Sequence, residues 1–376
     1  MSDSPTPTTL DAAPFWAAIA LFPLVWVGVI MGGWTVFLVS IYGWMLFPLL
    51  DRFSGFDLEN LDPQTPRPAL FWYRLGILVW TPLQVVTLFG GIAVVARGDH
   101  LAAWEVFFVI SGLGILSGLG GIVYAHELMH KQTRLERWLA DVLMAMVQYG
   151  HFRTEHMLVH HAHVGTPRDA VTARYNEHFH KFFFRVIWQC LRSAWRAEAA
   201  RLARKGLPAW DRSNPFWRYA TLQLGFIILA VLAGGWIGLG FYLFAALVAV
   251  WQLELINYVE HYGLTRKHLG NGRYEPQKPH HSWNAAQFSS NRLLINLQRH
   301  SDHHVRPDRD YPLLQNYGPD QAPQLPYGYG VMSTMALIPP LWRRRMNPLV
   351  RHWRRTFYPE ITDWRPYSAG TTPMPR

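Results

Sequence analysis

The chain has 376 residues, of which 50% are hydrophobic and only 16% charged, whereas a soluble domain usually has about 25% charged residues. This deficit argues against a freely soluble protein. The net charge is +10 and Cys190 is the only cysteine, which excludes an intrachain disulfide, a four-cysteine zinc site and a cysteine-ligated iron–sulfur cluster within the chain.

Four charge-free runs are long enough to cross a bilayer, which takes about 20 apolar helical residues. They cover 12–50, 75–96, 106–125 and 219–253. The first and last runs each hold two spans. Gly32-Gly33-Trp34 and Gly234-Gly235-Trp236 are predicted to be their turns, because glycine adopts the backbone angles of a tight helical hairpin. We expect an all-α integral membrane protein with six transmembrane helices, four in 1–125 and two in 219–253.

Two polar segments, 126–218 and 254–357, complete the predicted organisation. With six spans, these segments lie on the same side as residues 51–74 and both termini, and this side carries 34 of the 35 Lys and Arg residues. The bias of Lys and Arg toward the cytoplasm predicts a helical cytoplasmic cap. Its basic surface is expected to contact anionic lipid and not nucleic acid. The tail 358–376, rich in Pro, Ser, Thr and Gly, is expected to be loosely ordered.

Nine of the 18 histidines fall into four clusters on the predicted cytoplasmic side. The clusters are HELMH with His126 and His130, HMLVHH with His156, His160 and His161, NYVEHYGL with His261, and LQRHSDHH with His300, His303 and His304. Helical spacings of three and four put imidazoles on a shared face, where they can bind a metal. Nine imidazoles exceed the need of one ion, so they predict a dinuclear site with four or five ligands per metal.

Several alternatives stay open at this point. Imidazole does not distinguish zinc, iron, copper and nickel. HELMH matches the H-E-x-x-H signature of zinc proteases, but an intramembrane protease would leave two clusters unused. A metal transporter would place its ligands near the bilayer midplane, whereas these lie at one end of the spans. His163, His280 and His281 are the nearest competitors for a ligand role.

The histidine motifs resemble those of the integral-membrane alkane 1-monooxygenases. This family is related to the xylene side-chain monooxygenases and, more distantly, to the membrane fatty acyl desaturases and hydroxylases. The most specific stretches are HELMHK at 126–131, the segment 149–174, NYVEHYGLTR at 257–266, GRYEPQKPHHSWN at 272–284 and LQRHSDHHVRPDRDYPLL at 297–314. NYVEHYGL and QKPHHSWN favour the alkane branch. Met157-Leu158-Val159 and Ala170 depart from the usual family pattern without changing a histidine.

The resemblance implies a non-haem diiron site held by the nine clustered histidines. It also implies insertion of one oxygen atom of dioxygen into the terminal C–H bond of an n-alkane, which gives a 1-alkanol. Electrons would come from rubredoxin, itself reduced by an NADH-dependent reductase. The implied location is the bacterial inner membrane, with the active site on the cytoplasmic side. Side-chain oxidation of xylene and desaturation or hydroxylation of fatty acyl chains are the family's alternative activities.

Acidic residues beside the histidines are predicted to support them, because a ligating imidazole usually donates its other N–H to a carboxylate or carbonyl. These residues are Glu127, Glu155, Asp169, Glu260 and Asp302, and each has solvated surface charge as its alternative. An alkane has no polar group, so its pocket must be apolar. Gly43 and Trp44 on the second span are predicted to line the substrate channel, although helix packing equally explains a glycine there.

Overall fold

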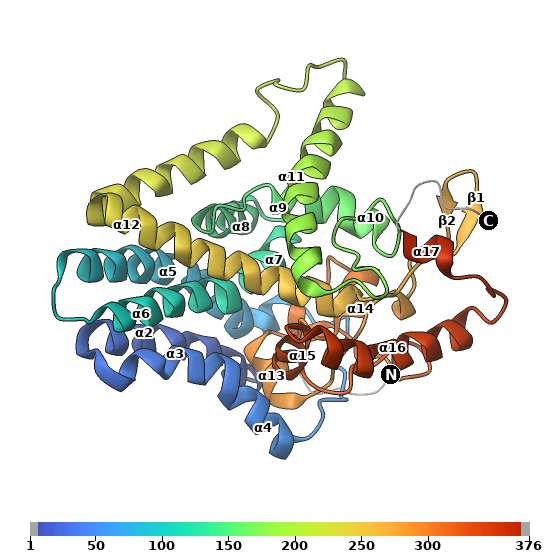
Figure 1. Cartoon of the computed structure of the whole chain (residues 1–376), viewed down its shortest axis with the longest axis horizontal. Coiled ribbons are helices and arrows are strands. Elements are labelled where there is room, and N and C mark those ends of the chain that lie inside the picture. The colour runs from blue at the N-terminus through green and yellow to red at the C-terminus, as the bar shows by residue number, and fades with distance from the viewer. Residues whose placement is uncertain (1–6, 370–376) are drawn as a thin grey trace.

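The computed structural model describes residues 7–369, most of which are helical (Figure 1). The α-helices are α1 (Thr9–Ala12), α2 (Leu21–Met31), α3 (Leu38–Ile41), α4 (Phe47–Ser54), α5 (Phe71–Arg97), α6 (Ala103–Leu116), α7 (Val123–Met129), α8 (Arg134–Met146), α9 (Phe152–Glu155), α10 (His161–His163), α11 (Phe179–Ala203), α12 (Phe216–His261), α13 (Phe288–Leu293), α14 (His300–Val305), α15 (Tyr329–Ala336), α16 (Pro339–Phe357) and α17 (Arg365–Ala369). Short 3₁₀ turns cover Ala13–Ala20, Gly33–Phe37, Arg67–Leu70, Pro279–His281 and Tyr311–Leu313. Single π-helical turns cover Tyr42–Leu46, Ser117–Ile122 and His156–His160.

Five continuous helical stretches within residues 7–369 are long and apolar enough to cross a membrane. They are Thr9–Met31, Gly33–Ser54, Arg67–Arg97, Ala103–Met129 and Phe216–His261. The sequence predicted six spans, and the difference lies in α12, whose 46 residues include the run 219–253 that was predicted to hold the last two. Gly234 and Gly235 have non-helical backbone angles, so α12 folds back on itself as two arms (Figure 1). Gly32 and Gly33 have φ values of 61° and 57°, which confirms the first predicted turn.

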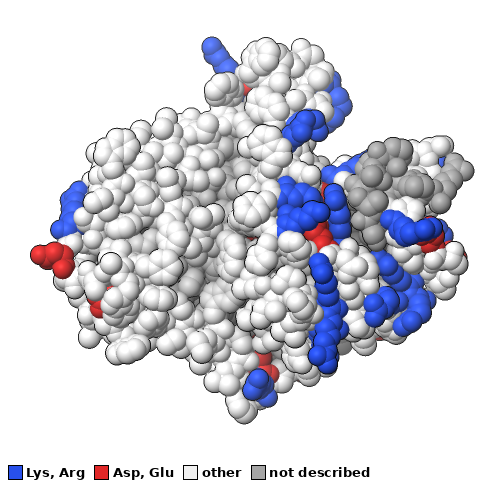
Figure 2. All heavy atoms as spheres, in the orientation of Figure 1, with Lys and Arg blue, Asp and Glu red and all other residues white. Residues whose placement is uncertain are grey.

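The second arm of α12 packs on α5 and α6, and α2 lies against both of those helices. The shorter helices α13–α16 gather at one end of this bundle (Figure 1). In Figure 2 the Lys and Arg side chains lie mainly over that end, and the surface of the bundle is nearly free of charge. This division between an uncharged bundle and a charged cap is the pattern of a multi-pass membrane protein.

Two local features differ from the sequence predictions. The all-α prediction omits a small antiparallel pair, β1 (His268–Gly270) and β2 (Arg273–Tyr274), in which His268 is opposite Tyr274. Its turn is Asn271-Gly272, with φ values of 52° and 68°, and Asn-Gly favours such a two-residue hairpin.

The predicted loose tail also differs from the structure over residues 358–369. Tyr358 is buried, and its ring centroid lies 5.2 Å from that of Trp353 on α16. Trp364 lies 4.5 Å from the guanidinium carbon of Arg354, and α17 follows it. Aromatic side chains within this Pro-rich segment therefore dock it on the cap, an effect that composition does not reveal. Residues 370–376 of the predicted tail lie outside the described residues.

Candidate metal centre

Four segments bring the clustered histidines to the cap end of the bundle. His126 lies on α7, which continues directly from α6 through the π turn Ser117–Ile122, and His130 follows the last residue of α7. His261 is the last residue of α12, and α14 begins at His300. The fourth segment is the π turn His156–His160. Each of the four segments is therefore part of a helical stretch that packs in the bundle or the cap.

The π turn changes which histidines meet. The sequence predicted that His156 and His160 share a helical face, as residues four apart do in an α-helix. A π turn instead brings residues five apart together, and the Nε2 atoms of His156 and His161 are 3.0 Å apart. His160 faces a different set of partners, with its Nε2 atom 3.2 Å from Nε2 of His304. This single turn therefore distributes neighbouring histidines between two positions.

Eight of the nine histidines form two groups, each of which could hold one metal ion. The first group is His126, His130, His156 and His303, and the second is His160, His261, His300 and His304. Within each group, the nitrogen atoms able to bind a metal all lie within 4.8 Å of one another. The ninth, His161, contacts both groups, with its ring centroid 4.8 Å from those of His130 and His304.

Distances between ring nitrogens fit imidazoles that surround a cation. Nε2 of His300 lies 3.1 Å from Nε2 of His261 and 3.0 Å from Nε2 of His304. In the other group, Nε2 of His130 lies 2.9 Å from Nε2 of His156. Metal-bound imidazole nitrogens lie about 2.1 Å from the ion, so neighbouring ligands at right angles are about 3 Å apart. The donor set is therefore suited to two metal ions.

The second ring nitrogens of two histidines face carboxylates. Nδ1 of His160 is 3.0 Å from Oδ2 of Asp169, and Nδ1 of His300 is 3.3 Å from Oε1 of Glu260. A carboxylate accepts the Nδ1 proton and leaves Nε2 with a free lone pair. The lone pairs of His160 and His300 then both point toward His304. Neutral His304 has a single N–H, so without a cation between them at least one of these buried lone pairs would have no donor.

Burial favours the neutral form of several of these histidines, and metal binding requires that form. It is the largest cause that lowers the pKa of six of them well below the ordinary value, and neighbouring imidazoles lower the pKa further. The six are His130, His156, His161, His300, His303 and His304.

Three of the five acidic residues predicted to support the ligands contact other groups. Glu127 accepts from Nζ of Lys131 at 2.6 Å and from the backbone N–H of Tyr311 at 2.9 Å. Asp302 accepts from Arg309, from the backbone N–H of Gln315 and from the Tyr317 hydroxyl group. Both carboxylates thus join the ligand-bearing helices α7 and α14 to the loop that follows α14.

Glu155 is fully buried next to His156, beside Cys190, and burial raises the pKa of its carboxyl group well above the ordinary value. Of the five carboxylates, Asp169 and Glu260 are thus the two brought within about 3.3 Å of a clustered histidine.

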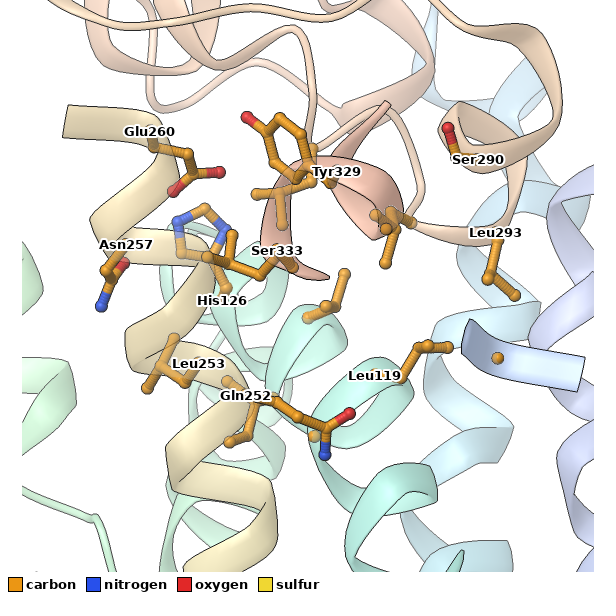
Figure 3. Close-up of a pocket in the computed structure, with 18 of the residues that line it drawn as sticks. Leu119, His126, Gln252, Leu253, Asn257, Glu260, Ser290, Leu293, Tyr329 and Ser333 are labelled. Atoms are coloured by element: carbon orange, nitrogen blue, oxygen red, sulfur yellow. The ribbon is translucent and has the colours of Figure 1, made fainter. Parts of the chain in front are cut away.

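An apolar cavity ends at the histidines (Figure 3). Gly43 and Trp44, predicted to line a substrate channel, both line it, together with Leu119, Ile122, Leu253 and Leu293. His126, His156, His160 and His300 close one end, beside Glu260 and Tyr329. In Figure 3 the ring of His126 lies beside Glu260, and the leucines extend away from it. The arrangement can hold an apolar chain with one end near the histidines.

The sequence analysis missed several polar residues of this cavity, namely Gln252, Asn257, Tyr329 and Ser333. Gln252 is buried on α12, where its side chain donates to the carbonyl oxygen of Gly114 on α6. It lies within the charge-free run 219–253, and polar residues inside a span commonly mark functional positions. This signal could have identified Gln252 and, five residues later on the same helix, Asn257.

A third cluster contains histidines but is hydrogen-bonded differently. The Tyr358 cluster comprises Glu275, His280, His281 and Tyr358. The backbone N–H of Lys278 donates to Nδ1 of His281 at 2.9 Å, so the proton of neutral His281 is on Nε2. This Nε2–H donates to the Tyr358 hydroxyl oxygen at 2.6 Å, and that hydroxyl group donates to Glu275. A protonated Nε2 cannot ligate a metal, so this cluster is a hydrogen-bonded network.

The chain is similar in sequence to several known proteins. Residues 102–336 match the fatty acid desaturase family model. The chain is 41% identical over 321 residues to alkane 1-monooxygenase 1 of Pseudomonas aeruginosa, covering 83% of this chain and 82% of that protein. It is 36% identical to alkane 1-monooxygenase 2 of Alcanivorax borkumensis, covering 89% of each chain. It is 30% identical to the xylene/toluene monooxygenase hydroxylase component of Pseudomonas putida, covering 67% of each.

Proposed function

The chain belongs to the alkane 1-monooxygenase family, a branch of the fatty acid desaturase family, and from this membership we propose that it is a diiron enzyme that converts n-alkanes to 1-alkanols. Its relatives establish the enzyme class as an oxidoreductase that hydroxylates alkanes. The observation that carries the diiron proposal is the pair of four-histidine groups at the end of an apolar cavity.

The nine histidines would hold two iron ions, one in each group of four histidines, and His161 contacts both groups. Bound iron supplies the redox chemistry with dioxygen that an unactivated C–H bond requires and that zinc does not provide. Asp169 fixes the tautomer and ring orientation of His160 through a hydrogen bond to Nδ1. Glu260 lies 3.3 Å from Nδ1 of His300 and is placed to do the same for that ring. Both carboxylates are buried, so water does not compete for these two contacts.

The cavity positions the substrate by shape, because an alkane offers no group for a hydrogen bond. Leu119, Leu253 and Leu293 exclude water along the chain, and the end lined by His126 would receive the terminal methyl group. One oxygen atom of dioxygen enters the alcohol and the other leaves as water. Each turnover therefore consumes two electrons and two protons in addition to the alkane.

We propose rubredoxin as the electron donor, with an NADH-dependent reductase behind it. The relatives imply a redox partner, and a chain with one buried cysteine cannot hold its own iron–sulfur centre. We further propose six crossings of the bacterial inner membrane, counting the two arms of α12 separately, with both termini and the histidines in the cytoplasm. The uneven distribution of Lys and Arg supports this orientation.

The decisive experiment combines metal analysis with product analysis. The purified protein in detergent should contain two irons per chain and should form 1-alkanol only with dioxygen and reduced rubredoxin present. Formation of a double bond would instead identify a desaturase, and selective oxidation of xylene methyl groups would identify side-chain oxidation. One zinc per chain with peptide cleavage would contradict the proposal entirely.

Gly43→Trp tests whether Gly43 lies on the substrate channel. A Cβ atom at Gly43 would lie 3.2 Å from Cδ1 of Leu119, another cavity residue. An indole there would fill the cavity at a distance from the histidines, so the longest alkane oxidised should become shorter while both irons remain bound. Gly43→Ala is the matched control and should keep the wild-type chain-length profile. An unchanged profile in a folded Gly43→Trp protein would leave helix packing as the role of Gly43.

A further inference from the structure

Electrons for the proposed reaction must enter through the surface of the cap. Within the described residues, that surface has a groove between α11 and the segment that carries His156, His160 and His161. We call it the arginine groove. It is lined by Leu158, Val159, His163, Pro167, Arg168, Ala170, Gln189, Arg192, Ser193, Arg196, Ala197, Ala200, Arg201 and Arg204.

The arginine groove concentrates positive charge without acidic residues in its lining. Arg168, Arg192, Arg196 and Arg204 are exposed. Arg201 is held by an ion pair with the buried Glu198. By contrast, Arg192 and Arg196 form no ion pair with any residue that the structure describes. The groove therefore offers unneutralised charge to an anionic surface.

The floor of the groove is the outer side of the histidine-bearing segment. Leu158 and Val159 belong to the π turn that positions His156 and His160. His163 follows two residues after His161, which is only partly buried and lies 3.0 Å, Nε2 to Nε2, from His156. A redox centre held in the groove would thus lie against the turn that carries His156 and His160, one histidine from each group.

From these observations we propose that the arginine groove is the docking surface for an acidic electron-transfer protein. The inference rests on the proposed function, because only a reaction that consumes external electrons needs such a partner. Complementary charge accelerates encounter and fixes orientation between redox partners. The groove combines attraction with proximity. Its arginines attract the partner, and its floor is the segment that carries three of the clustered histidines.

The opposite face of α11 argues for a protein and against lipid as the occupant. Helix geometry of about 3.6 residues per turn places Phe184, Trp188 and Trp195 roughly 80° around α11 from Arg192 and Arg196. The same stripe lies roughly 150° from Ser193 and Ala200, which line the middle of the groove. Phe184 and Trp188 are 77% and 63% exposed. Because α11 runs across the direction of α5 and α6 (Figure 1), this aromatic stripe can lie on the bilayer. The middle of the arginine groove then faces away from the lipid, and Arg192 and Arg196 lie on its side nearer the bilayer surface.

The test uses the full-length, iron-loaded protein in nanodiscs and a reduced acidic rubredoxin as the probe. In Arg192→Glu/Arg196→Glu, the KM for rubredoxin at low ionic strength should rise about tenfold or more, and its salt dependence should flatten. The kcat at saturating rubredoxin should stay near the wild-type value. Arg344→Glu/Arg355→Glu on α16 is the matched control, because it makes the same charge change elsewhere on the cap and should alter KM less than about twofold.

Rubredoxin binding to immobilised nanodiscs, measured without alkane, separates this inference from the proposed function. Loss of binding in the groove variant alone supports docking there, even if no alkanol were formed. Equal losses in both variants, or no loss in either, would overturn it. Weaker association of the groove variant with vesicles of anionic lipid, with unchanged affinity for rubredoxin, would assign the groove to lipid and also overturn it.

Discussion

The metal centre and the Tyr358 cluster both contain adjacent histidines in the sequence, but their chemistry differs. In the metal centre, the Nδ1 atoms of His160 and His300 face carboxylates, and their Nε2 atoms point toward His304. In the Tyr358 cluster, a backbone N–H donates to Nδ1 of His281, and its Nε2 faces a hydroxyl group. The partner of the second nitrogen therefore decides whether an imidazole can bind a metal. Proximity of histidines alone does not.

The largest expected contrast between the clusters is in iron content. His300→Ala removes one of the converging Nε2 atoms, so the variant should lose iron and essentially all alkane oxidation. His281→Ala should keep two irons per chain, because His281 offers no free lone pair. Metal analysis of the purified, folded variants checks both, with the exposed His352→Ala as control. A His300→Ala protein with two irons and normal turnover would refute the ligand assignment.

Carboxylates give the next contrast. Asp169→Asn keeps the shape of the side chain but replaces an acceptor of the Nδ1 proton with an amide, so iron affinity should fall about 10–100-fold. Glu275→Gln makes the same change in the Tyr358 cluster and should leave iron affinity unchanged. Competition with a chelator measures both affinities. Equal losses would mean that the two carboxylates have equivalent roles, and the comparison between the clusters would fail.

Much of this architecture was predictable because it depends on local pattern. Charge-free runs located the spans, Gly32 and Gly235 ended up at positive φ in the predicted turns, and the clustered histidines were brought together as expected. The exceptions depend on contacts between distant segments. Glu127 lies one residue from His126, but Lys131 and Tyr311 take up its oxygens. Nothing in the sequence around Glu127 indicates that Tyr311 will be its neighbour.

The π turn at His156–His160 shows a second limit of sequence patterns. HMLVHH has the same spacing whether the turn is α-helical or π-helical, so the sequence alone pairs His156 with His160. The pairing with His161 arises because one extra residue is accommodated within the turn. Similarly, the role of His280 and His281 depends on Tyr358, which is more than 70 residues away and whose hydroxyl group both imidazoles contact.

Tyr358→Phe should have a smaller effect, on stability and not on metal binding. The substitution removes a buried hydroxyl group that accepts from His280 and His281 and donates to Glu275. Leaving these groups without a partner should lower the free energy of unfolding by about 1–3 kcal/mol. Denaturant titration of the cap in detergent, followed by tryptophan fluorescence, measures the change. Loss of iron from this variant would show that the two clusters are coupled.

The smallest expected effect is on the pH dependence of stability. Burial, with the nearby His281, lowers the pKa of His280 to about 4, against about 6.5 for a free imidazole. Between these two pH values, His280 binds a proton in the unfolded chain and not in the folded cluster. The free energy of unfolding therefore decreases as the pH falls from 6.5 toward 4. The groups facing it are Glu275, Lys278, His281 and the Tyr358 hydroxyl group.

His280→Gln isolates this contribution, because glutamine retains a donor for Tyr358 and does not titrate. The melting temperature of the variant should fall less than that of the wild type as the pH decreases through this window, and both should behave alike above pH 7. His281 keeps its own lowered pKa in both proteins, and the other titratable groups are the same in both, so the difference between the two profiles reports His280 alone. Parallel profiles down to pH 4 would mean that the pKa of His280 is the same in the folded and the unfolded protein, and the lowering of this pKa by burial would be refuted.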